Sequence, residues 1–195
     1  MLIIQLRGTH GAGKTTAVRE YIEKGNFIAR DQRIRGAHII YQFDGKIAII
    51  GKYCAAASGG IDGYITNKDV LKNTIAIAAK EIQPEVLVFE GVMYGQTFQF
   101  SYDIARWAKA KGYEYCALCL HAAIDEQILR VYQRNDGKEF DVAKMLDKYK
   151  RGEQANVKLA AKGVWIEQVD TSKIEYGSMY KPLEEVIEKY RSTIA

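Results

Sequence analysis

Short hydrophobic runs alternate along the chain with longer amphipathic runs. Strand-like runs occur at Leu2–Leu6, Asn26–Ala29, His38–Phe43, Ile47–Ile50, Glu85–Phe89, Tyr113–Leu120 and Val164–Val169. Helix-like runs occur at Thr15–Lys24, 66–82, Thr97–Lys111, Asp125–Arg134, Asp141–Ala161 and Pro182–Arg191. This alternation is typical of an α/β fold built on a parallel sheet.

Local signals add detail to this pattern. Asp44-Gly45 separates two strand-like runs and suits a tight type I′ turn, so we expect an antiparallel hairpin near residues 38–51. Residues 53–65 contain three glycines without a clear period and are expected to form a loop. Thr66, with Asp69 three residues later, resembles a capping box that opens the next helix. No repeat or linker interrupts residues 1–195, which predicts a single domain.

The composition is that of a globular protein. Hydrophobic residues make up 48% and charged residues 27% of the chain, which excludes wholesale disorder. No apolar run approaches the roughly 18–20 residues that a membrane helix needs, and the N-terminus lacks the features of a signal peptide. The three cysteines argue against a disulfide framework. These features predict a cytoplasmic protein without a membrane partner.

Positive charge is concentrated in two stretches. Residues 130–162 contain nine basic and five acidic side chains, and so account for the whole net charge of +4. Residues 30–52 contain five basic side chains and two acidic ones. Such stretches are commonly solvated faces. They become candidate binding surfaces only if they flank a phosphate site.

One motif carries specific chemistry. Residues 8–15, GTHGAGKT, match the P-loop pattern and lie between an apolar strand and a helix-like run, as that motif requires. The glycines let backbone N–H groups surround phosphates, Lys14 can reach the β- and γ-phosphates, and the Thr15 hydroxyl can bind Mg²⁺. We therefore expect ATP and Mg²⁺ as cofactors. The expected nucleotide-binding residues are Gly8, Thr9, His10, Gly11, Ala12, Gly13, Lys14, Thr15 and Thr16.

Further charged residues fit a phosphoryl-transfer site. Glu90 follows the strand-like run Glu85–Phe89 and is the candidate acid that binds Mg²⁺ together with Thr15. Arg130 and Arg134 are four residues apart on one helix, so they share a face and could stabilise the charge on a transferred phosphate. A Gly-containing turn follows them, as expected for a lid near residues 130–141.

Two acids are candidates for the base that accepts a proton from the attacking hydroxyl. Asp31 ends the second strand-like run, seventeen residues after Lys14. Asp62 lies among glycines that would let a substrate approach closely. Either acid could instead have a local role, Asp31 in a surface ion pair and Asp62 in an Asx-turn. The sequence leaves this choice open.

Aromatic residues surround the segment after Glu90. Phe98, Phe100 and Tyr102, together with Tyr53 and Tyr64, would line the acceptor side and could hold an unstacked base. The alternative is that they pack in the core. Cys116 and Cys119 fall on opposite faces of one strand, so neither a redox pair nor a metal site is expected there.

These motifs together resemble the nucleotide-kinase-like P-loop kinases. The resemblance rests on the P-loop, on Glu90-Gly91 after the middle strand, and on the late pair Arg130 and Arg134. It implies a three-layer fold with about five parallel strands, helices on both faces, a small β-hairpin insertion and a helical lid. It also implies that Asp170–Ser172 lies near the adenine.

A narrower resemblance concerns small bacteriophage kinases. Gly51-Lys52-Tyr53, the Gly-Gly-x-Asp of residues 59–62 and the Phe-Glu-Gly-Val of residues 89–92 are similar to motifs of kinases that phosphorylate 5-hydroxymethyl-deoxyuridine in phage DNA. Residues 30–33, Arg-Asp-Gln-Arg, loosely resemble a region of polynucleotide kinases. This resemblance implies a DNA partner that contains a modified pyrimidine, and the host cytoplasm as location.

The sequence therefore favours an ATP- and Mg²⁺-dependent kinase, with 5-hydroxymethyl-deoxyuridine in phage DNA as the preferred acceptor. A kinase of (deoxy)nucleoside monophosphates or other small molecules remains open, and its acceptor phosphate would bind the arginines near residues 30–35. A nucleotide-dependent switch or DNA-binding ATPase is the alternative from another class.

Overall fold

The computed structural model describes residues 1–34, 37–51, 53, 60–62, 65, 67–91 and 95–194, and for residues 30–43 it describes the backbone only. Its strands are β1 Leu2–Arg7, β2 Ile28–Ile34, β3 Ala37–Phe43, β4 Ile47–Ile50, β5 Val86–Glu90, β6 Glu114–His121 and β7 Trp165–Asp170. Its helices are α1 Lys14–Lys24, α2 Lys68–Glu81, α4 Phe98–Ala110, α5 Ile124–Arg134, α6 Val142–Ala161 and α7 Lys181–Ile194, with a short 3₁₀ turn, η1, at Thr171–Lys173.

The strands form one sheet in the order β2-β3-β4-β5-β1-β6-β7. The five strands from β4 to β7 in this order are parallel to their neighbours, which confirms the expected parallel sheet. Strands β2 and β3 are added antiparallel at one edge. The predicted hairpin is present as β3 and β4. It is part of the sheet instead of an insertion, because the fully buried strand β4 pairs with β5.

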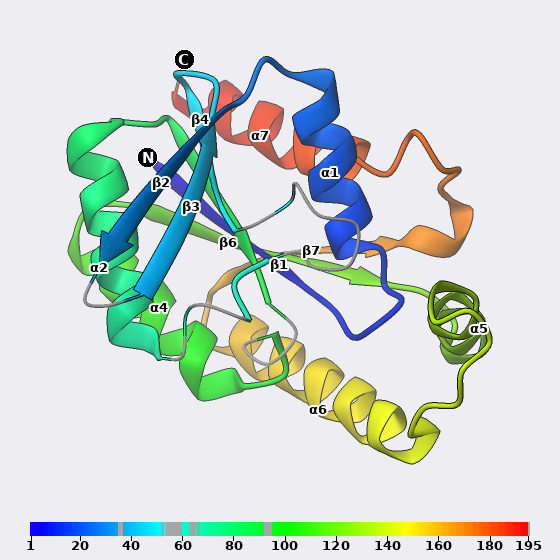
Figure 1. Cartoon of the computed structure of the whole chain (residues 1–195). Helices are drawn as coiled ribbons and strands as arrows, with labels where there is room; N and C mark the ends of the chain where they lie inside the picture. Colours follow the sequence, from blue (N-terminus) through cyan, green and yellow to red (C-terminus); the bar gives the residue numbers. More distant parts are fainter. Residues whose placement is uncertain are drawn as a thin grey trace.

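Helices cover both faces of the sheet, so the molecule has three layers (Figure 1). One hydrophobic core joins α2 and α4 to one face, and a second joins α1 and α7 to the other. Strand β1 contributes to both cores, with Ile3 on one side and Leu2 and Ile4 on the other. Burial on both faces explains why this strand is an almost continuous apolar run.

Two expected boundaries were wrong. Strand β2 extends to Ile34, well beyond the predicted end at Ala29, because an edge strand can carry the polar residues that the hydrophobic pattern excludes. Helix α2 is capped by Asn67, whose side chain accepts hydrogen bonds from Asp69 N and Val70 N at 3.0 and 2.9 Å. Thr66, the expected cap, lies outside the described residues. None of the described helices has the length and apolar character needed to cross a membrane.

Candidate active site

The P-loop connects the end of β1 to the start of α1. Gly8 and Gly11 have φ values of 138° and 76°, in the region that favours glycine. A Cβ atom on Gly8 would lie 2.4 Å from Leu120 O, and one on Gly11 would lie 2.5 Å from Gln127 O. The loop is therefore enclosed by β6 and α5 as well as by its own strand and helix. This close packing explains the glycines at these positions, and it fixes a backbone whose N–H groups can bind phosphates.

Lys14 is buried, with only 5% of its surface exposed. Its ammonium group donates a hydrogen bond to Thr9 O at 2.9 Å, within the same loop. Burial lowers the pKa of Lys14, and the carboxylates of Glu90 and Asp62 oppose that effect. The electrostatic effect of both carboxylates on Lys14 indicates that the candidate metal ligand, Glu90, and one of the two candidate bases, Asp62, lie near this ammonium group.

Glu90 and Thr15 form the candidate Mg²⁺ site. Glu90 ends β5 and pairs in register with Leu6 of β1, which places its carboxylate beside the P-loop. Thr15 Oγ1 donates a hydrogen bond to Glu90 Oε1 at 2.7 Å. Glu90 is 2% exposed, and burial raises its pKa, whereas Lys14 and the hydrogen bond from Thr15 act in the opposite direction.

A carboxylate and a hydroxyl this close offer the oxygen ligands that Mg²⁺ prefers. Within the described part of the chain, no group of three or more His, Cys, Asp or Glu side chains could hold a metal. Two protein oxygen ligands are compatible with Mg²⁺, which commonly takes its remaining ligands from water and substrate phosphates.

Asp62 reaches this site through a short segment packed on Glu90. Ile61 N donates a hydrogen bond to Glu90 O at 2.9 Å, and a Cβ atom on Gly60 would lie 2.6 Å from the same oxygen. Asp62 follows directly, is half-buried, and acts electrostatically on both Lys14 and Glu90. The loop glycine Gly60 is thus what lets the backbone approach β5 closely enough to bring Asp62 near the P-loop.

Asp31 occupies a different place. It lies inside the edge strand β2, paired with Ile40, and does not end the strand as the sequence suggested. The register places it level with the end of β5, but three strands away. At roughly 4.8 Å per strand, that separation is about 14 Å. Between the two candidate acids, the backbone arrangement brings Asp62 and not Asp31 to the P-loop.

The two arginines of α5 have different environments. Arg130 donates hydrogen bonds to Gly11 O at 3.2 Å, to Thr171 Oγ1 at 3.0 Å and to Thr171 O at 3.1 Å, and also binds Glu126. It therefore joins the P-loop to η1, the segment expected near the adenine. Arg134 lies close enough to Lys14 and His10 to lower the pKa of both. Of the two, Arg134 is better placed to face a bound phosphate.

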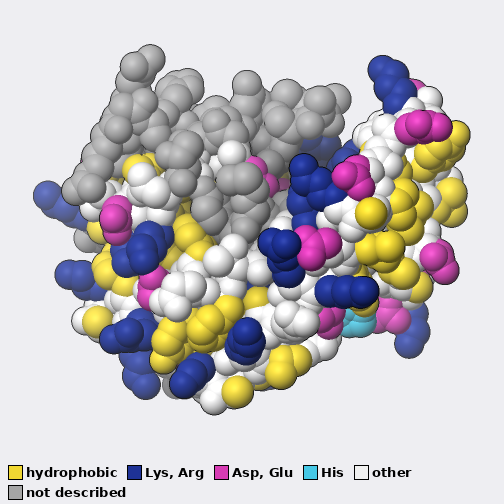
Figure 2. Space-filling model, turned by 90° about the horizontal axis from the view of Figure 1, so that it is seen from below, with side chains coloured by type: hydrophobic (Ala, Val, Ile, Leu, Met, Phe, Trp, Pro, Cys, Tyr) yellow, Lys and Arg dark blue, Asp and Glu magenta, His cyan; other side chains and the backbone are white. Residues whose placement is uncertain are grey.

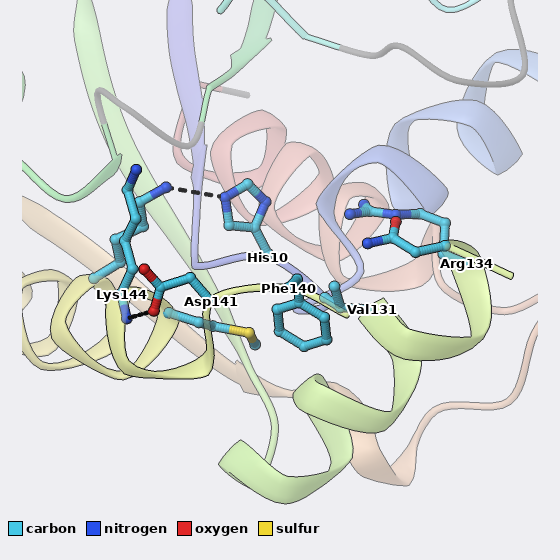
Figure 3. A pocket seen from close by; sticks show the side chains of 9 residues that line it. His10, Val131, Arg134, Phe140, Asp141 and Lys144 are labelled. Carbon is cyan, nitrogen blue, oxygen red and sulfur yellow. Dashed lines mark hydrogen bonds between the residues drawn. The ribbon is translucent and has the colours of Figure 1, made fainter. Parts of the chain in front are cut away.

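A cavity of about 220 Å³ lies beside the P-loop (Figure 3). Its lining comes from His10, from the end of α5 and from the first turns of α6, and includes Arg134, Lys144 and Lys148. Lys148 Nζ lies 3.2 Å from His10 Nε2. This position of Lys148 was not predicted from the sequence, in which it is one of nine basic residues in its stretch. No local pattern marks Lys148 for this contact, which depends on the packing of α6 beside the P-loop.

The His10 imidazole is a sensitive reporter of this environment. Burial and the charges of Lys148, Lys14 and Arg134 lower its pKa to about 4. We expect an ATP analogue to raise that pKa, because triphosphate charge offsets the three cations. Since the pKa is below the usual 6.5 in the folded protein, the His10 contribution makes stability rise with pH between about 4 and 6.5.

NMR titration of the histidine ring protons would measure this pKa, with His10→Gln to assign the resonance. Lys148→Gln should raise the pKa in the absence of nucleotide, and Lys162→Gln, at the far end of α6, should leave it unchanged. A His10 pKa near 6.5 in the free protein would contradict the arrangement.

The expected aromatic lining is only partly present. Phe100 and Tyr53 are buried in the two hydrophobic cores, which corrects their assignment to the acceptor side. Phe98 is half-buried and stacks on Tyr102, with ring centroids 5.2 Å apart and planes inclined by 15°. Tyr64 lies outside the described residues, as do Met93, Tyr94 and Cys54. Cys116 and Cys119 are free thiols in different cores, on opposite faces of β6 as expected.

The basic stretch 130–162 comprises the end of α5, the turn after it and the whole of α6. Figure 2 shows lysine and arginine side chains spread over the lower face of the molecule, among acidic and apolar side chains. The second basic stretch falls mostly on residues 30–43, whose side chains are not described, and on Lys52, which lies outside the described residues.

Comparison with known proteins supports the phage resemblance. No protein-family model matches the chain. A protein of Pseudomonas phage M6 named 5-hmdU DNA kinase is 28% identical over 96% of this chain and 98% of its own length. Another of that name, from Delftia phage PhiW-14, is 32% identical over 52% of this chain, a match that spans 41% of that protein.

Among solved structures, a chain from the PezAT chromosomal toxin-antitoxin system of Streptococcus pneumoniae aligns over 98% of this chain and 86% of its own. The identity is 16% and the TM-score 0.45, a likeness too low to support a functional argument. The sequence relatives are more informative. The chain is similar over nearly its whole length to a phage protein named 5-hmdU DNA kinase, which agrees with the family resemblance drawn from its sequence.

Proposed function

We propose that this protein is an ATP-dependent kinase that transfers the γ-phosphate to the 5-hydroxymethyl group of 5-hydroxymethyl-deoxyuridine in DNA. The observation that carries the proposal is the contact between Thr15 and Glu90 beside the buried Lys14, with Asp62 nearby. This set supplies a phosphate-binding cation, oxygen ligands for Mg²⁺ and a carboxylate that can accept the proton of the acceptor hydroxyl. The choice of acceptor is supported by the printed names of the two phage relatives.

In the proposed reaction, the hydroxymethyl oxygen attacks the γ-phosphorus and forms a new P–O bond. The bond between the γ-phosphorus and the oxygen bridging to the β-phosphate breaks, and ADP leaves. The proton of the hydroxyl passes to the Asp62 carboxylate. Lys14 and the P-loop N–H groups hold the phosphates, while Arg134 stabilises charge on the transferred group. Mg²⁺ bound at Thr15 and Glu90 would neutralise charge on the β- and γ-phosphates.

The acceptor base must leave the duplex stack to reach such a site. The 5-substituent of a stacked pyrimidine lies in the major groove, and enzymes that react at a base take that base out of the stack. The base is therefore expected to be flipped out or presented in a single strand. Single-stranded DNA avoids the cost of unpairing, so it is expected to be phosphorylated more readily than the matching duplex.

Transfer of labelled γ-phosphate from ATP tests this function. Three acceptors are offered in parallel: a single-stranded oligonucleotide with one 5-hydroxymethyluracil, the same oligonucleotide with thymine, and a panel of deoxynucleoside monophosphates. Label on the hydroxymethylated oligonucleotide alone is the expected result. Label on a monophosphate would indicate a small-molecule kinase instead. Phosphate released to water without labelled product would identify an ATPase and overturn the kinase proposal.

A further inference from the structure

A second cavity, of about 410 Å³, lies between the beginning of α4 and the second half of α6. We call it the α4–α6 groove. Gln96, Thr97 and Phe98 line one side, and Arg151 and Lys158 line the other. Its described lining contains two cationic side chains and no carboxylate. Its volume falls within the range of small-ligand sites, and its charge favours an anion.

The groove is connected to the P-loop on both sides. On the α4 side, a Cβ atom on Gly95 would lie 3.6 Å from Gly8 N, so the residue just before the groove touches the start of the P-loop. On the α6 side, the buried Arg7 donates a hydrogen bond from Nε to Asn156 Oδ1 at 2.8 Å. Arg7 also binds Ser101 of α4. Both walls are thus fixed to the end of β1, directly before the phosphate-binding residues.

The polar groups of the groove are arranged to receive a phosphate. Arg151 and Lys158 are seven residues apart, two turns of α6, and so project from the same face. Asp147 holds Arg151 through bonds of 2.8 and 3.1 Å, which orients the guanidinium group. Arg151 and Lys158 are donors of the kind that contact phosphate oxygens.

An aromatic side chain lies beside these donors. Phe98 lines the groove and stacks on Tyr102. Arg106 lies 5.9 Å from the centroid of the Tyr102 ring, which extends the stack along α4. An aromatic ring next to cations is the combination that binds single-stranded nucleic acid, because a base stacks on the ring while the backbone follows the positive charge.

We infer that the α4–α6 groove binds the DNA strand next to the acceptor nucleotide, with a backbone phosphate at Arg151 and Lys158 and a base at Phe98. The inference rests on the proposed function and deepens it, because it states how a polymeric substrate is distinguished from a nucleoside. The acceptor base enters the site at the P-loop, and the flanking nucleotide occupies the groove. The free nucleoside lacks the backbone, so it makes none of these contacts.

The test compares two double variants of α6 that remove the same charge. Arg151→Gln with Lys158→Gln alters the groove, whereas Lys150→Gln with Lys162→Gln alters exposed residues of the same helix outside it. For the groove variant, we expect the KM for the hydroxymethylated oligonucleotide to rise about tenfold. The slope of log affinity against log salt should become less negative by about 1.4, at 0.7 for each lost contact with a single-stranded phosphate. The KM for ATP and the rate with the free nucleoside should not change.

A separate variant tests the aromatic contact. Phe98→Leu is expected to raise the oligonucleotide KM by roughly tenfold while leaving the salt slope unchanged, because stacking releases no counterions. Equal oligonucleotide KM values and salt slopes for the groove and control variants would overturn the inference. It would also be overturned if the groove variant lost activity equally with the free nucleoside.

Failure of the proposed function would be recognised separately. If the wild-type protein transfers no phosphate to hydroxymethylated DNA, fluorescence anisotropy with the same oligonucleotide still measures the salt slope of each variant. A less negative salt slope in the groove variant alone would then support the groove as a DNA site. The failed transfer would separately reject hydroxymethylated DNA as the phosphoryl acceptor. Identical slopes in both double variants would reject the groove as well.

Discussion

Replacing Lys14 with methionine should lower phosphoryl transfer by at least about 10³-fold, whichever acceptor is used. Lys14 is the buried cation of the P-loop, held 2.9 Å from Thr9 O and flanked by Glu90 and Asp62. Charge that develops on the β- and γ-phosphates loses its partner inside the P-loop once this ammonium group is removed, and Arg134 and Mg²⁺ would approach the phosphates from other sides and not replace it. The measurement is the single-turnover rate of transfer at saturating ATP, which separates the chemical step from binding and release.

The choice of methionine keeps the effect local. A methionine side chain has nearly the length of lysine, so the packing around position 14 should be retained. The thermal unfolding temperature reports any cost of leaving the buried Glu90 without the charge of Lys14. Lys24→Met is the matched control, because Lys24 is the exposed last residue of the same helix. Within the described part of the chain, its ion pair is with Glu184. Transfer by Lys14→Met within tenfold of the Lys24→Met rate would contradict the phosphate-binding role.

The sequence predicted the P-loop region best because two independent signals agree there. The apolar run of β1 is buried on both faces, and the motif that follows requires a strand before it and a helix after it. Glu90 was predicted for a similar reason: β5 is an apolar strand, and its last residue must lie at the same edge as the P-loop in a parallel sheet. The hydrophobic pattern and the P-loop motif are each formed by residues that are neighbours in the chain, so both can be recognised in a single sequence.

The positions of the two candidate acids depend on information that the sequence pattern lacks. Asp31 and Asp62 both follow strand-like or glycine-rich segments, and only the strand order separates them. Strand β4 pairs with β5 up to Ile50 and Phe89, and Gly60 makes its close approach to Glu90 at the same edge of the sheet. The polar strand β2 is displaced to the edge. The contact between His10 and Lys148 has the same origin, because it depends on how α6 packs beside the P-loop.

Asp62→Asn should reduce the rate of transfer to the acceptor by about 10²- to 10⁴-fold, the range expected when a general base is removed. The amide keeps the size and a hydrogen-bonding oxygen but cannot accept the hydroxyl proton. Affinity for ATP should change little, because the phosphate contacts of Lys14 and the Mg²⁺ ligands Thr15 and Glu90 remain. The measurements are the single-turnover rate with hydroxymethylated DNA and the dissociation constant of ATP with Mg²⁺.

The other candidate acid provides the control. Asp31→Asn makes the same chemical change about 14 Å across the sheet, at roughly 4.8 Å for each of three strand spacings, and should keep the rate within a few-fold of the wild type. Glu90→Gln should differ from both variants by weakening binding of ATP in a Mg²⁺-dependent way. If Asp31→Asn lost the larger share of activity, the acceptor would have to approach from the β2 edge. Full activity in both aspartate variants would instead mean that neither acid removes the proton, and that the hydroxyl is activated by the phosphates themselves.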